Sequence, residues 1–289
     1  MSRIAYVNGQ YVPLADATVP IEDRGYQLAD GVYEVIAVRG GVPIDLAPHL
    51  RRLDQSLSAL HMAPPMGERA LRVILRTVTA RNRLVEGILY VQISRGVARR
   101  EHAFPPSSVR PSLVVTARTQ ALAPESMFEK GVAVITDADL RWKRCDIKSI
   151  ALLPNVLGKQ GARERNAFET WLLAPDKTVT EGTSSNAWIV TGRGQVITRP
   201  LSHAILGGIT RSRTLEVAHR LGLKVVEHPF TLEEARRAAE AFLTSTTAFI
   251  LPVVRLDGKQ IGDGWPGAIT RRLRAAYLSA LAGGGVAGW

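Results

Sequence analysis

The sequence predicts an α+β fold in two domains, each with its own sheet. Apolar residues alternate with polar ones over short runs, as in strands, and recur every three or four residues over longer runs, as in helices. The strand-like runs come in pairs joined by short turns, which indicates antiparallel hairpins. The pattern stops at 121–127, around Pro124, and then begins again. We therefore expect a smaller N-terminal domain over residues 1–120, a linker over 121–127 and a larger C-terminal domain over 128–289.

The N-terminal domain is expected to contain two hairpins, two helices and two further strands. Asn8-Gly9 and Gly40-Gly41 are typical of the tight turns that join antiparallel strands. A first helix should begin near Ala47, because leucines follow at helical spacing, and a second should span 68–81. The expected strands are residues 4–7, 11–12, 32–38, 42–44, 88–94 and 113–117.

The C-terminal domain repeats this mixture of strands and helices. Thr231 and Glu234 have the spacing of a capping box, which predicts the start of a short helix. Asp257-Gly258 is typical of a hairpin turn. The expected strands are residues 132–136, 170–173, 187–190, 196–198, 224–227 and 241–243, and the longer helices are 152–165, 210–221 and a last one that ends near Leu281.

The composition is that of a packed globular protein from a reducing compartment. Hydrophobic residues make up 46% of the 289 residues and charged residues 22%, which excludes a disordered chain. Cys145 is the one cysteine, so no disulfide can form within the chain. The first residues lack the pattern of a signal peptide, and no apolar run is long enough to cross a bilayer. We expect a cytoplasmic protein.

The formal net charge of +11 comes from 37 Lys and Arg against 26 Asp and Glu. A strongly basic chain can be a nucleic-acid-binding protein. Here the basic residues are scattered over expected helix surfaces, and aromatic residues, which would stack on bases, make up 6% of the chain. This class is therefore disfavoured, and the charge indicates a surface that attracts small anions such as oxo acids.

The densest polar segment, Arg141–Ser149, contains a candidate nucleophile. Lys148 lies between Ile147 and the apolar run Ile150–Leu153. A lysine that enters an apolar region is costly unless it is paired or neutralised, and a neutral amine attacks carbonyl carbons. The alternative is that this run of charges forms an ordinary solvated loop.

Three other polar segments could hold an anion. Gly207–Thr210 precedes an expected helix, whose first N–H groups could bind a phosphate. Ser245–Thr247 follows an expected strand and offers hydroxyls and amides. Glu181–Asn186 is expected to form a polar loop between strands. Each segment could instead serve only helix capping and turn formation.

Together these segments resemble the fold-type-IV pyridoxal-phosphate enzymes. Five motifs carry the resemblance, in the same order and at similar spacings: EDRGYQLADGVYEV (Glu22–Val35), RWKRCDIKS (Arg141–Ser149), TVTEGTSSN (Thr178–Asn186), LGGITR (Leu206–Arg211) and LTSTT (Leu243–Thr247). Within this fold type the chain is most similar to the D-amino-acid aminotransferases, because Arg100-Glu101-His102 stands before Phe104-Pro105. The resemblance extends from about Tyr6 to Gly262 and implies a homodimer of two-domain chains.

The resemblance implies that pyridoxal 5′-phosphate is the cofactor and that no metal is needed. Lys148 would form the Schiff base and move a proton between the substrate Cα and the cofactor C4′. Glu181 would keep the pyridine nitrogen protonated, so that the ring can accept electrons. The phosphate would be bound by the Arg52 guanidinium, by the amides of Ile209 and Thr210 and by Ser245 and Thr246, with Leu206 against the ring face.

The same resemblance implies how the substrate is held. Tyr33, Arg100 and His102 would bind the α-carboxylate, with Arg100 and His102 supplied by the partner subunit. Ser184, Ser185 and Thr247 would line the other side of the pocket. Judged singly, Tyr33 would be a core aromatic of a strand, Arg52 and its neighbour Arg51 surface residues of a helix, and His102 an ordinary loop histidine.

Glu101 departs from the family pattern, in which a small uncharged residue stands between the arginine and the histidine. If its carboxylate points inward it would oppose a substrate carboxylate, and if it points outward it pairs with Arg99 and changes little. The predicted reaction is ping-pong transamination between a D-amino acid, such as D-alanine or D-glutamate, and 2-oxoglutarate or pyruvate.

The alternatives within the same fold are a branched-chain L-amino-acid aminotransferase, an R-selective amine aminotransferase and aminodeoxychorismate lyase. The Arg100/His102 pair argues against all three.

Overall fold

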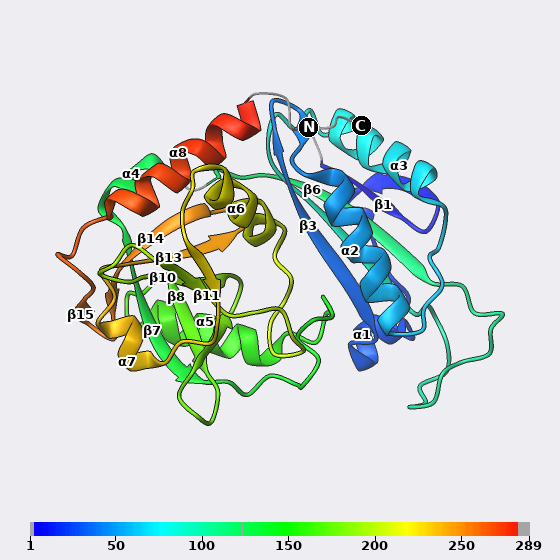
Figure 1. Cartoon of the computed structure of the whole chain (residues 1–289). Coiled ribbons are helices and arrows are strands. Elements are labelled where there is room, and N and C mark those ends of the chain that lie inside the picture. Colours follow the sequence, from blue (N-terminus) through cyan, green and yellow to red (C-terminus); the bar gives the residue numbers. More distant parts are fainter. Residues whose placement is uncertain (1–2, 123, 283–289) are drawn as a thin grey trace. The chain divides into compact units, whose positions relative to one another are not determined.

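The computed structural model describes residues 3–122 and 124–282 and confirms the α+β fold class (Figure 1). The contacts within the chain divide these residues into two compact units. Unit 1 comprises residues 3–122 and 147–151, and unit 2 comprises 124–146 and 152–282. The segment that carries Lys148 thus groups with the N-terminal strands and helices, whereas the sequence-based boundary assigns it to the C-terminal domain.

Unit 1 contains a six-stranded antiparallel sheet in the order β2-β1-β6-β5-β3-β4. Its strands are β1 (Ile4–Val7), β2 (Gln10–Pro13), β3 (Gly31–Arg39), β4 (Val42–Pro43), β5 (Glu86–Ser94) and β6 (Ser112–Thr119). Both expected hairpins are confirmed. Asn8 and Gly9 turn the first with φ of 44° and 102°, a region that asparagine and glycine tolerate better than other residues.

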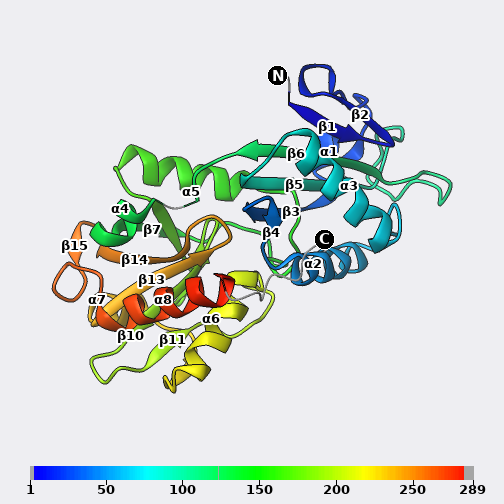
Figure 2. The same ribbon diagram turned by 90° about the horizontal axis from the view of Figure 1, so that it is seen from above.

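Two helices, α2 (Leu46–Ala59) and α3 (Glu68–Arg81), share one core with this sheet. α2 lies against β3 (Figure 2). Its apolar stripe buries Leu50, Leu53 and Leu57. Leu60, expected within the helix, follows its last residue instead. The sequence pattern missed the one-turn helices η1 (Leu14–Asp16) and α1 (Arg24–Leu28), because so few residues show no periodicity.

Alternation along β3 decides which of its polar residues enters this core. Glu34 shares a strand face with Val32 and Ile36, which pack in the core with α2. Tyr33 lies on the opposite face. A charged side chain at position 34 is therefore fully buried, with an exposed fraction of 0%.

Unit 2 contains a mixed nine-stranded sheet in the order β12-β11-β10-β13-β14-β7-β8-β9, with β15 paired to β14. Its strands are β7 (Val132–Ala138), β8 (Glu169–Leu173), β9 (Val179–Gly182), β10 (Asn186–Val190), β11 (Val196–Thr198), β12 (Val225–Glu227), β13 (Glu240–Ser245), β14 (Phe249–Leu256) and β15 (Lys259–Gln260). The pairs β11–β12, β14–β7 and β7–β8 are parallel, and the others are antiparallel.

The helices of unit 2 are α4 (Glu125–Lys130), α5 (Leu153–Glu164), α6 (Ile209–Arg220), α7 (Leu232–Arg236) and α8 (Ala268–Ala282). The expected capping box at the start of α7 is confirmed, since Thr231 Oγ1 accepts from the Glu234 amide and the Glu234 carboxylate accepts from the Thr231 amide. Throughout the part of the chain that is described, no helix combines the length and the apolar character needed to span a bilayer.

The sheet of unit 2 curls so that β9 contacts β10, although four strands stand between them in the sheet order. The chain passes from one to the other through the short turn at 183–185. The prediction that Glu181 lies in a loop is wrong, because it lies within β9. All four residues of this strand are buried, so they show no alternation that the sequence could reveal.

One more element was not expected. The segment predicted as a structureless linker contains α4, which begins after Pro124. Its single buried residue is Phe128. A six-residue helix with one apolar anchor has too little periodicity to be recognised from the sequence.

Candidate active site

The residues predicted to form the site divide between the two units. Tyr33, Arg52, Arg100, His102 and Lys148 belong to unit 1. Glu181, Ser184, Ser185, Leu206, Ile209, Thr210, Ser245, Thr246 and Thr247 belong to unit 2.

Lys148 is half-buried beside Tyr33. Its Nζ lies 4.2 Å from the centroid of the tyrosine ring, within the range of a cation–π interaction. The backbone fixes the pair, because the Tyr33 amide donates to the Lys148 carbonyl at 3.0 Å and the Lys148 amide donates to Ser56 Oγ at 3.2 Å. The structure thus brings the candidate nucleophile and one predicted substrate-binding residue together.

Glu34, His49 and Arg52 form a buried group that we name the Glu34 cluster. Arg52 donates from Nε to Glu34 Oε1 and from Nη2 to Oε2, both at 2.7 Å. His49 Nδ1 lies 2.7 Å from Oε2. Arg52 is 8% exposed, so it is not a surface residue. Its neighbour Arg51 is exposed, as expected.

The Glu34 cluster is electrostatically balanced. Burial by itself would raise the pKa of Glu34, but the charge and hydrogen bonds of Arg52 and His49 lower it to about 2. Burial lowers the pKa of His49, although the adjacent Glu34 carboxylate opposes this. The ion pair therefore consists of one carboxylate and one guanidinium, with a histidine that burial tends to keep neutral.

The loop that carries Arg100 and His102 exposes both side chains. Its backbone is held from outside the loop, because Arg24 Nη1 donates to the Glu101 carbonyl at 2.6 Å. The Arg95 guanidinium also lies 3.8 Å from the centroid of the Phe104 ring. The Glu101 side chain is exposed to solvent.

Glu181 is the centre of a second buried group. Its carboxylate accepts from Arg141 Nη1, from Asn186 Nδ2 at 2.9 Å and from the Leu206 amide at 3.1 Å. Burial raises the pKa of Glu181 to about 7, although the charge of Arg141 opposes the rise. Asp139 shares the same arginine, with 2.7 Å between Arg141 Nη2 and Asp139 Oδ2. We name Asp139, Arg141 and Glu181 the Glu181 cluster.

Asn186 joins the Glu181 cluster to the start of α6. Its Nδ2 donates to the Leu206 carbonyl at 3.0 Å as well as to Glu181. A Cβ placed on Gly208 would lie 2.0 Å from Asn186 Oδ1, so only glycine fits at this position. Gly208 is the N-cap of α6, whose first residues are Ile209 and Thr210. The first N–H groups of this helix therefore lie near the Glu181 cluster.

Ser184 and Ser185 have a partner that the sequence did not indicate. Both hydroxyls donate to Glu169 Oε2, at 2.8 and 3.1 Å. Thr183 Oγ1 donates to Oε1 of the same carboxylate, which is 0% exposed. Because both hydroxyl hydrogens are donated to Glu169, the serine oxygens can act only as acceptors toward a ligand. A substrate carboxylate is itself an acceptor, so it is not suited to these two oxygens.

Ser245, Thr246 and Thr247 are half-buried at the end of β13. Ser245 Oγ accepts from the Ala248 amide at 3.2 Å, which turns the chain toward β14. β13 pairs with β10, where Thr244 lies opposite Asn186. Asn186 thus connects the two predicted phosphate-binding segments. It pairs with Thr244, which precedes Ser245 on β13, and it bonds to Leu206, which precedes α6.

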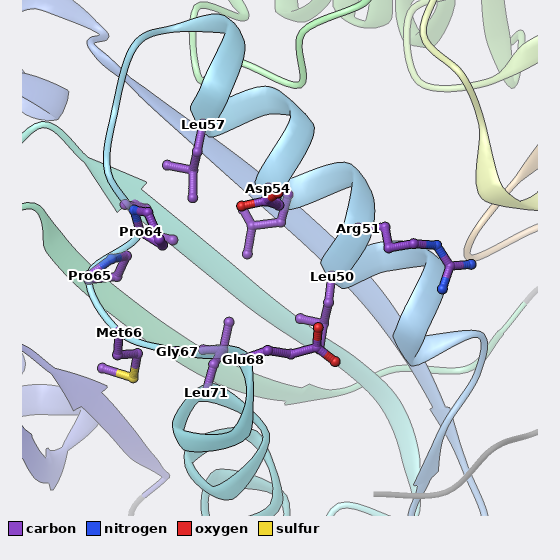
Figure 3. Close-up of a pocket in the computed structure, with 12 residues that line it drawn as sticks. Leu50, Arg51, Asp54, Leu57, Pro64, Pro65, Met66, Gly67, Glu68 and Leu71 are labelled. Carbon is purple, nitrogen blue, oxygen red and sulfur yellow. The ribbon is translucent and has the colours of Figure 1, made fainter.

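One pocket in unit 1 is lined by none of the groups described above. A pocket of about 190 Å³ is lined by α2, α3 and the segment at Pro64–Gly67. Leu50 and Leu71 point toward it, whereas Arg51 is directed away (Figure 3). The residues that line it include none of the predicted site residues. Among residues 3–122 and 124–282, no cluster of His, Cys, Asp and Glu has the make-up of a metal site.

Several functional candidates escaped the sequence reasoning. Glu34 did give a signal, since it is the one charged residue in the apolar run of β3. Asp139 and Arg141 lie in a polar segment that looks solvated. Glu169 and Asn186 acquire their roles only through partners elsewhere in unit 2.

Comparison with known families gives one match that covers most of the chain. The family model described as amino-transferase class IV matches residues 31–256. D-alanine aminotransferase of Bacillus licheniformis is 40% identical over 275 residues, which cover 95% of both chains. D-alanine aminotransferase of Staphylococcus aureus (strain MSSA476) is 37% identical over 272 residues, which cover 94% of this chain and 95% of that protein.

Solved structures show the same fold. The branched-chain amino acid aminotransferase of T.th., solved with pyridoxamine 5′-phosphate, superposes with a TM-score of 0.90 at 26% identity, over 98% of this chain and 95% of that one. The 4-amino-4-deoxychorismate lyase from Pseudomonas aeruginosa gives a TM-score of 0.82 at 26% identity, over 96% of this chain and 99% of that one.

Proposed function

Because the chain belongs to the class IV aminotransferases, we propose that it transfers an amino group between a D-amino acid and a 2-oxo acid with pyridoxal 5′-phosphate as cofactor. D-Alanine and D-glutamate are the proposed donors, and 2-oxoglutarate and pyruvate the proposed acceptors. The reaction is ping-pong, since the amino group rests on the cofactor between the two substrates. The buried Glu181 carboxylate is the observation that carries the proposal.

The donor set of unit 2 fits this cofactor. Glu181 is buried and held by three hydrogen-bond donors, and its cluster retains an excess of negative charge, which suits a protonated ring nitrogen. α6 begins at Gly208, which has no side chain to cap its first N–H groups. A helix N-terminus of this kind binds phosphate. Thr246, with Ser245, would add a hydroxyl to that phosphate site.

When bound, pyridoxal phosphate supplies an aldehyde that receives the amino group and a ring that accepts the electrons released at the substrate Cα. Lys148 would hold the cofactor through Nζ, and its amine would carry the proton that leaves the substrate Cα. Glu181 holds a proton at the ring nitrogen. Leu206 would pack against the cofactor ring, and Tyr33, whose ring contacts Lys148 Nζ, would orient the lysine.

Arg52 binds the phosphate with its direction set by Glu34. The Nε–Nη2 edge of the guanidinium, which is the edge best suited to a bidentate contact, is bound to Glu34. In this role Glu34 fixes the plane of the guanidinium.

The proposed substrate follows from the relatives and from the Arg100–x–His102 sequence. Both curated relatives described above are D-alanine aminotransferases. Arg100 and His102 are exposed, which suits side chains that complete the site of a partner subunit in a homodimer. Glu101 is exposed as well, and its carbonyl accepts from Arg24 Nη1; the proposal requires that its carboxylate points away from the substrate carboxylate. Ser184, Ser185 and Thr247 are secondary members of the pocket. With a single cysteine, the proposed location is the cytoplasm.

The deciding experiment is the visible spectrum of the purified protein after D-alanine and L-leucine are added in separate samples. A yellow protein that is bleached by D-alanine alone supports the cofactor, the first half-reaction and the stereochemistry together. A protein that stays colourless after pyridoxal phosphate is added would contradict the proposal.

A branched-chain L-amino-acid aminotransferase is the second candidate, because the T.th. enzyme of the branched-chain class shares the fold at a TM-score of 0.90. It predicts bleaching by L-leucine and none by D-alanine. The lower identity of 26%, against 40% for the D-alanine aminotransferase of Bacillus licheniformis, makes it the weaker candidate.

A further inference from the structure

The Glu181 cluster contains two carboxylates and one guanidinium. Arg141 donates from Nε to Asp139 Oδ1 at 2.9 Å and from Nη2 to Oδ2 at 2.7 Å. Glu181 receives a single nitrogen of the same guanidinium, Nη1. The Arg141 side chain is 6% exposed. Asp139 therefore holds the bidentate edge of the arginine, and Glu181 shares the same guanidinium through a single nitrogen.

The charges of this cluster do not cancel. Asp139 and Glu181 carry two negative charges when ionised, and Arg141 carries one positive charge. Cys145 also faces the cluster, and burial raises the pKa of its thiol to about 11, so it stays neutral. A buried net charge is costly in the absence of a counter-ion. The cluster is thus one cation short of balance.

The Glu181 carboxylate is also fixed in direction. Oε1 accepts from Arg141 and from the Leu206 amide, and Oε2 accepts from Asn186 and from the same amide. Donors from three segments far apart in the sequence thus hold both oxygens. A carboxylate held in this way cannot rotate toward another partner. A cation that pairs with it must therefore bind at this position.

We propose that Asp139 and Arg141 are positioning residues for the ring nitrogen of the cofactor. Arg141 holds the Glu181 carboxylate in place, and Asp139 shares the charge of Arg141, so that one negative charge of the two carboxylates remains for a cationic ring nitrogen. This inference rests on the proposed function and adds to it the residues that set the charge of Glu181. In cofactor-free protein the missing cation is replaced by a proton on Glu181, in agreement with its pKa of about 7.

The inference predicts opposite effects for two substitutions. Asp139→Asn removes the competitor for Arg141, so the Glu181 carboxyl should ionise at lower pH, with its acid dissociation constant raised about tenfold. Arg141→Met removes the cation, so the same constant should fall about tenfold or more. A purely structural role for the pair would disturb folding without moving the two constants in opposite directions.

The measurement is a pH titration by ¹³C NMR of the full-length protein labelled at glutamate Cδ, with the Glu181 signal assigned by its loss in Glu181→Gln. In the cofactor-free protein the signal should titrate near pH 7. With pyridoxal phosphate bound, it should remain at the carboxylate position across the same range.

Two matched variants serve as controls. Asp257→Asn changes an aspartate that bonds to Thr136 and Arg236. Arg274→Met removes a buried arginine that bonds to the Ile250 carbonyl and to Glu125. Neither should move the Glu181 titration.

Three results would overturn the inference: no Glu181 titration near neutral pH, an Asp139→Asn variant that titrates as the parent does, or a control that shifts as far as the test variants. If Arg141→Met does not fold, the decision rests on Asp139→Asn, which keeps the shape of the side chain. A protein that never takes up pyridoxal phosphate would contradict the proposed function but leave the cofactor-free titration intact. A protein that takes up pyridoxal phosphate but does not show the predicted shifts would contradict this inference and leave the proposed function intact.

Discussion

Glu34 and Glu181 are both buried glutamates that pair with an arginine, but their electrostatic states are opposite. Glu34 lies in unit 1, and Arg52 and His49 lower its pKa to about 2. Glu181 lies in unit 2, and burial raises its pKa to about 7 in spite of Arg141. Neither is more than 5% exposed. Burial alone therefore does not decide whether such a carboxyl is charged.

The difference comes from how each arginine is shared. Arg52 donates two nitrogens to Glu34. Arg141 donates one nitrogen to Glu181 and its bidentate edge to Asp139. Glu34 thus has a complete counter-ion, whereas Glu181 competes for its own. A complete pair suits a structural role, and an incomplete pair suits a group that awaits a cationic ligand.

Lys148→Ala should have the largest effect and should abolish transamination, because it removes the amine that attaches to the cofactor. Turnover is measured with D-alanine and 2-oxoglutarate. Full activity in this variant would contradict the mechanism.

Glu181→Gln should lower kcat by about 10²- to 10³-fold, because the ring nitrogen loses the charged partner that stabilises it in the transition state. Glu34→Gln should lower kcat less, since Glu34 acts through Arg52. Steady-state kinetics of the two variants at saturating cofactor make the comparison. If kcat falls equally in the two variants, it is wrong to assign Glu34 a structural role and Glu181 a ligand-binding role.

Glu34→Ala should lower the free energy of unfolding by about 3–5 kcal/mol, because it leaves the Arg52 guanidinium buried without a partner. Glu181→Ala should cost less in cofactor-free protein, because the missing carboxyl is neutral over much of the pH range. Urea denaturation of both variants at pH 6 measures the two losses. Equal losses would remove the distinction between the complete and the incomplete ion pair.

The two carboxyls should also give stability opposite dependences on pH. The folded pKa of Glu34 is depressed, so its contribution is present above the unfolded value near 4.5 and is lost as pH falls toward about 2. The folded pKa of Glu181 is raised, so stability falls as pH rises from about 4.5 to about 7. Comparing cofactor-free parent and Glu181→Gln by thermal unfolding should show a shallower decline in the variant. An identical decline would mean that Glu181 is not the group that titrates.

Arg100→Ala should give a smaller effect, confined to substrates with a carboxylate. Loss of one charge-assisted hydrogen bond should raise KM for D-alanine about tenfold or more, with little change for a simple amine. Glu101→Gln is the matched control in the same loop and should change KM by less than about twofold, because its side chain is exposed. A similar rise for the amine would remove Arg100 from carboxylate binding, and a large effect of Glu101→Gln would place its charge near the substrate.

The sequence by itself determined the local structure of both units. Asn8-Gly9, the leucines of α2 and the capping box at Thr231 each specify their turn or helix through interactions within a few residues, and the structure confirms all three. Where local signals were weak, as in the four buried residues of β9 or in α4 with its one apolar anchor, the expectation was wrong or absent. The five motifs taken together identified the family, because a resemblance integrates many positions at once.

Only the tertiary structure decided which charges meet. Arg52 lies 18 residues from Glu34, and Arg141 lies 40 residues from Glu181. Nothing in the local spacing shows that Glu34 binds a histidine as well as its arginine, or that Glu181 shares its arginine with Asp139. The ionisation of a buried carboxyl depends on the number and direction of its donors and on the water that burial removes. Those quantities exist only after the strands and helices have packed, so the sequence could name Glu181 but could not give its charge.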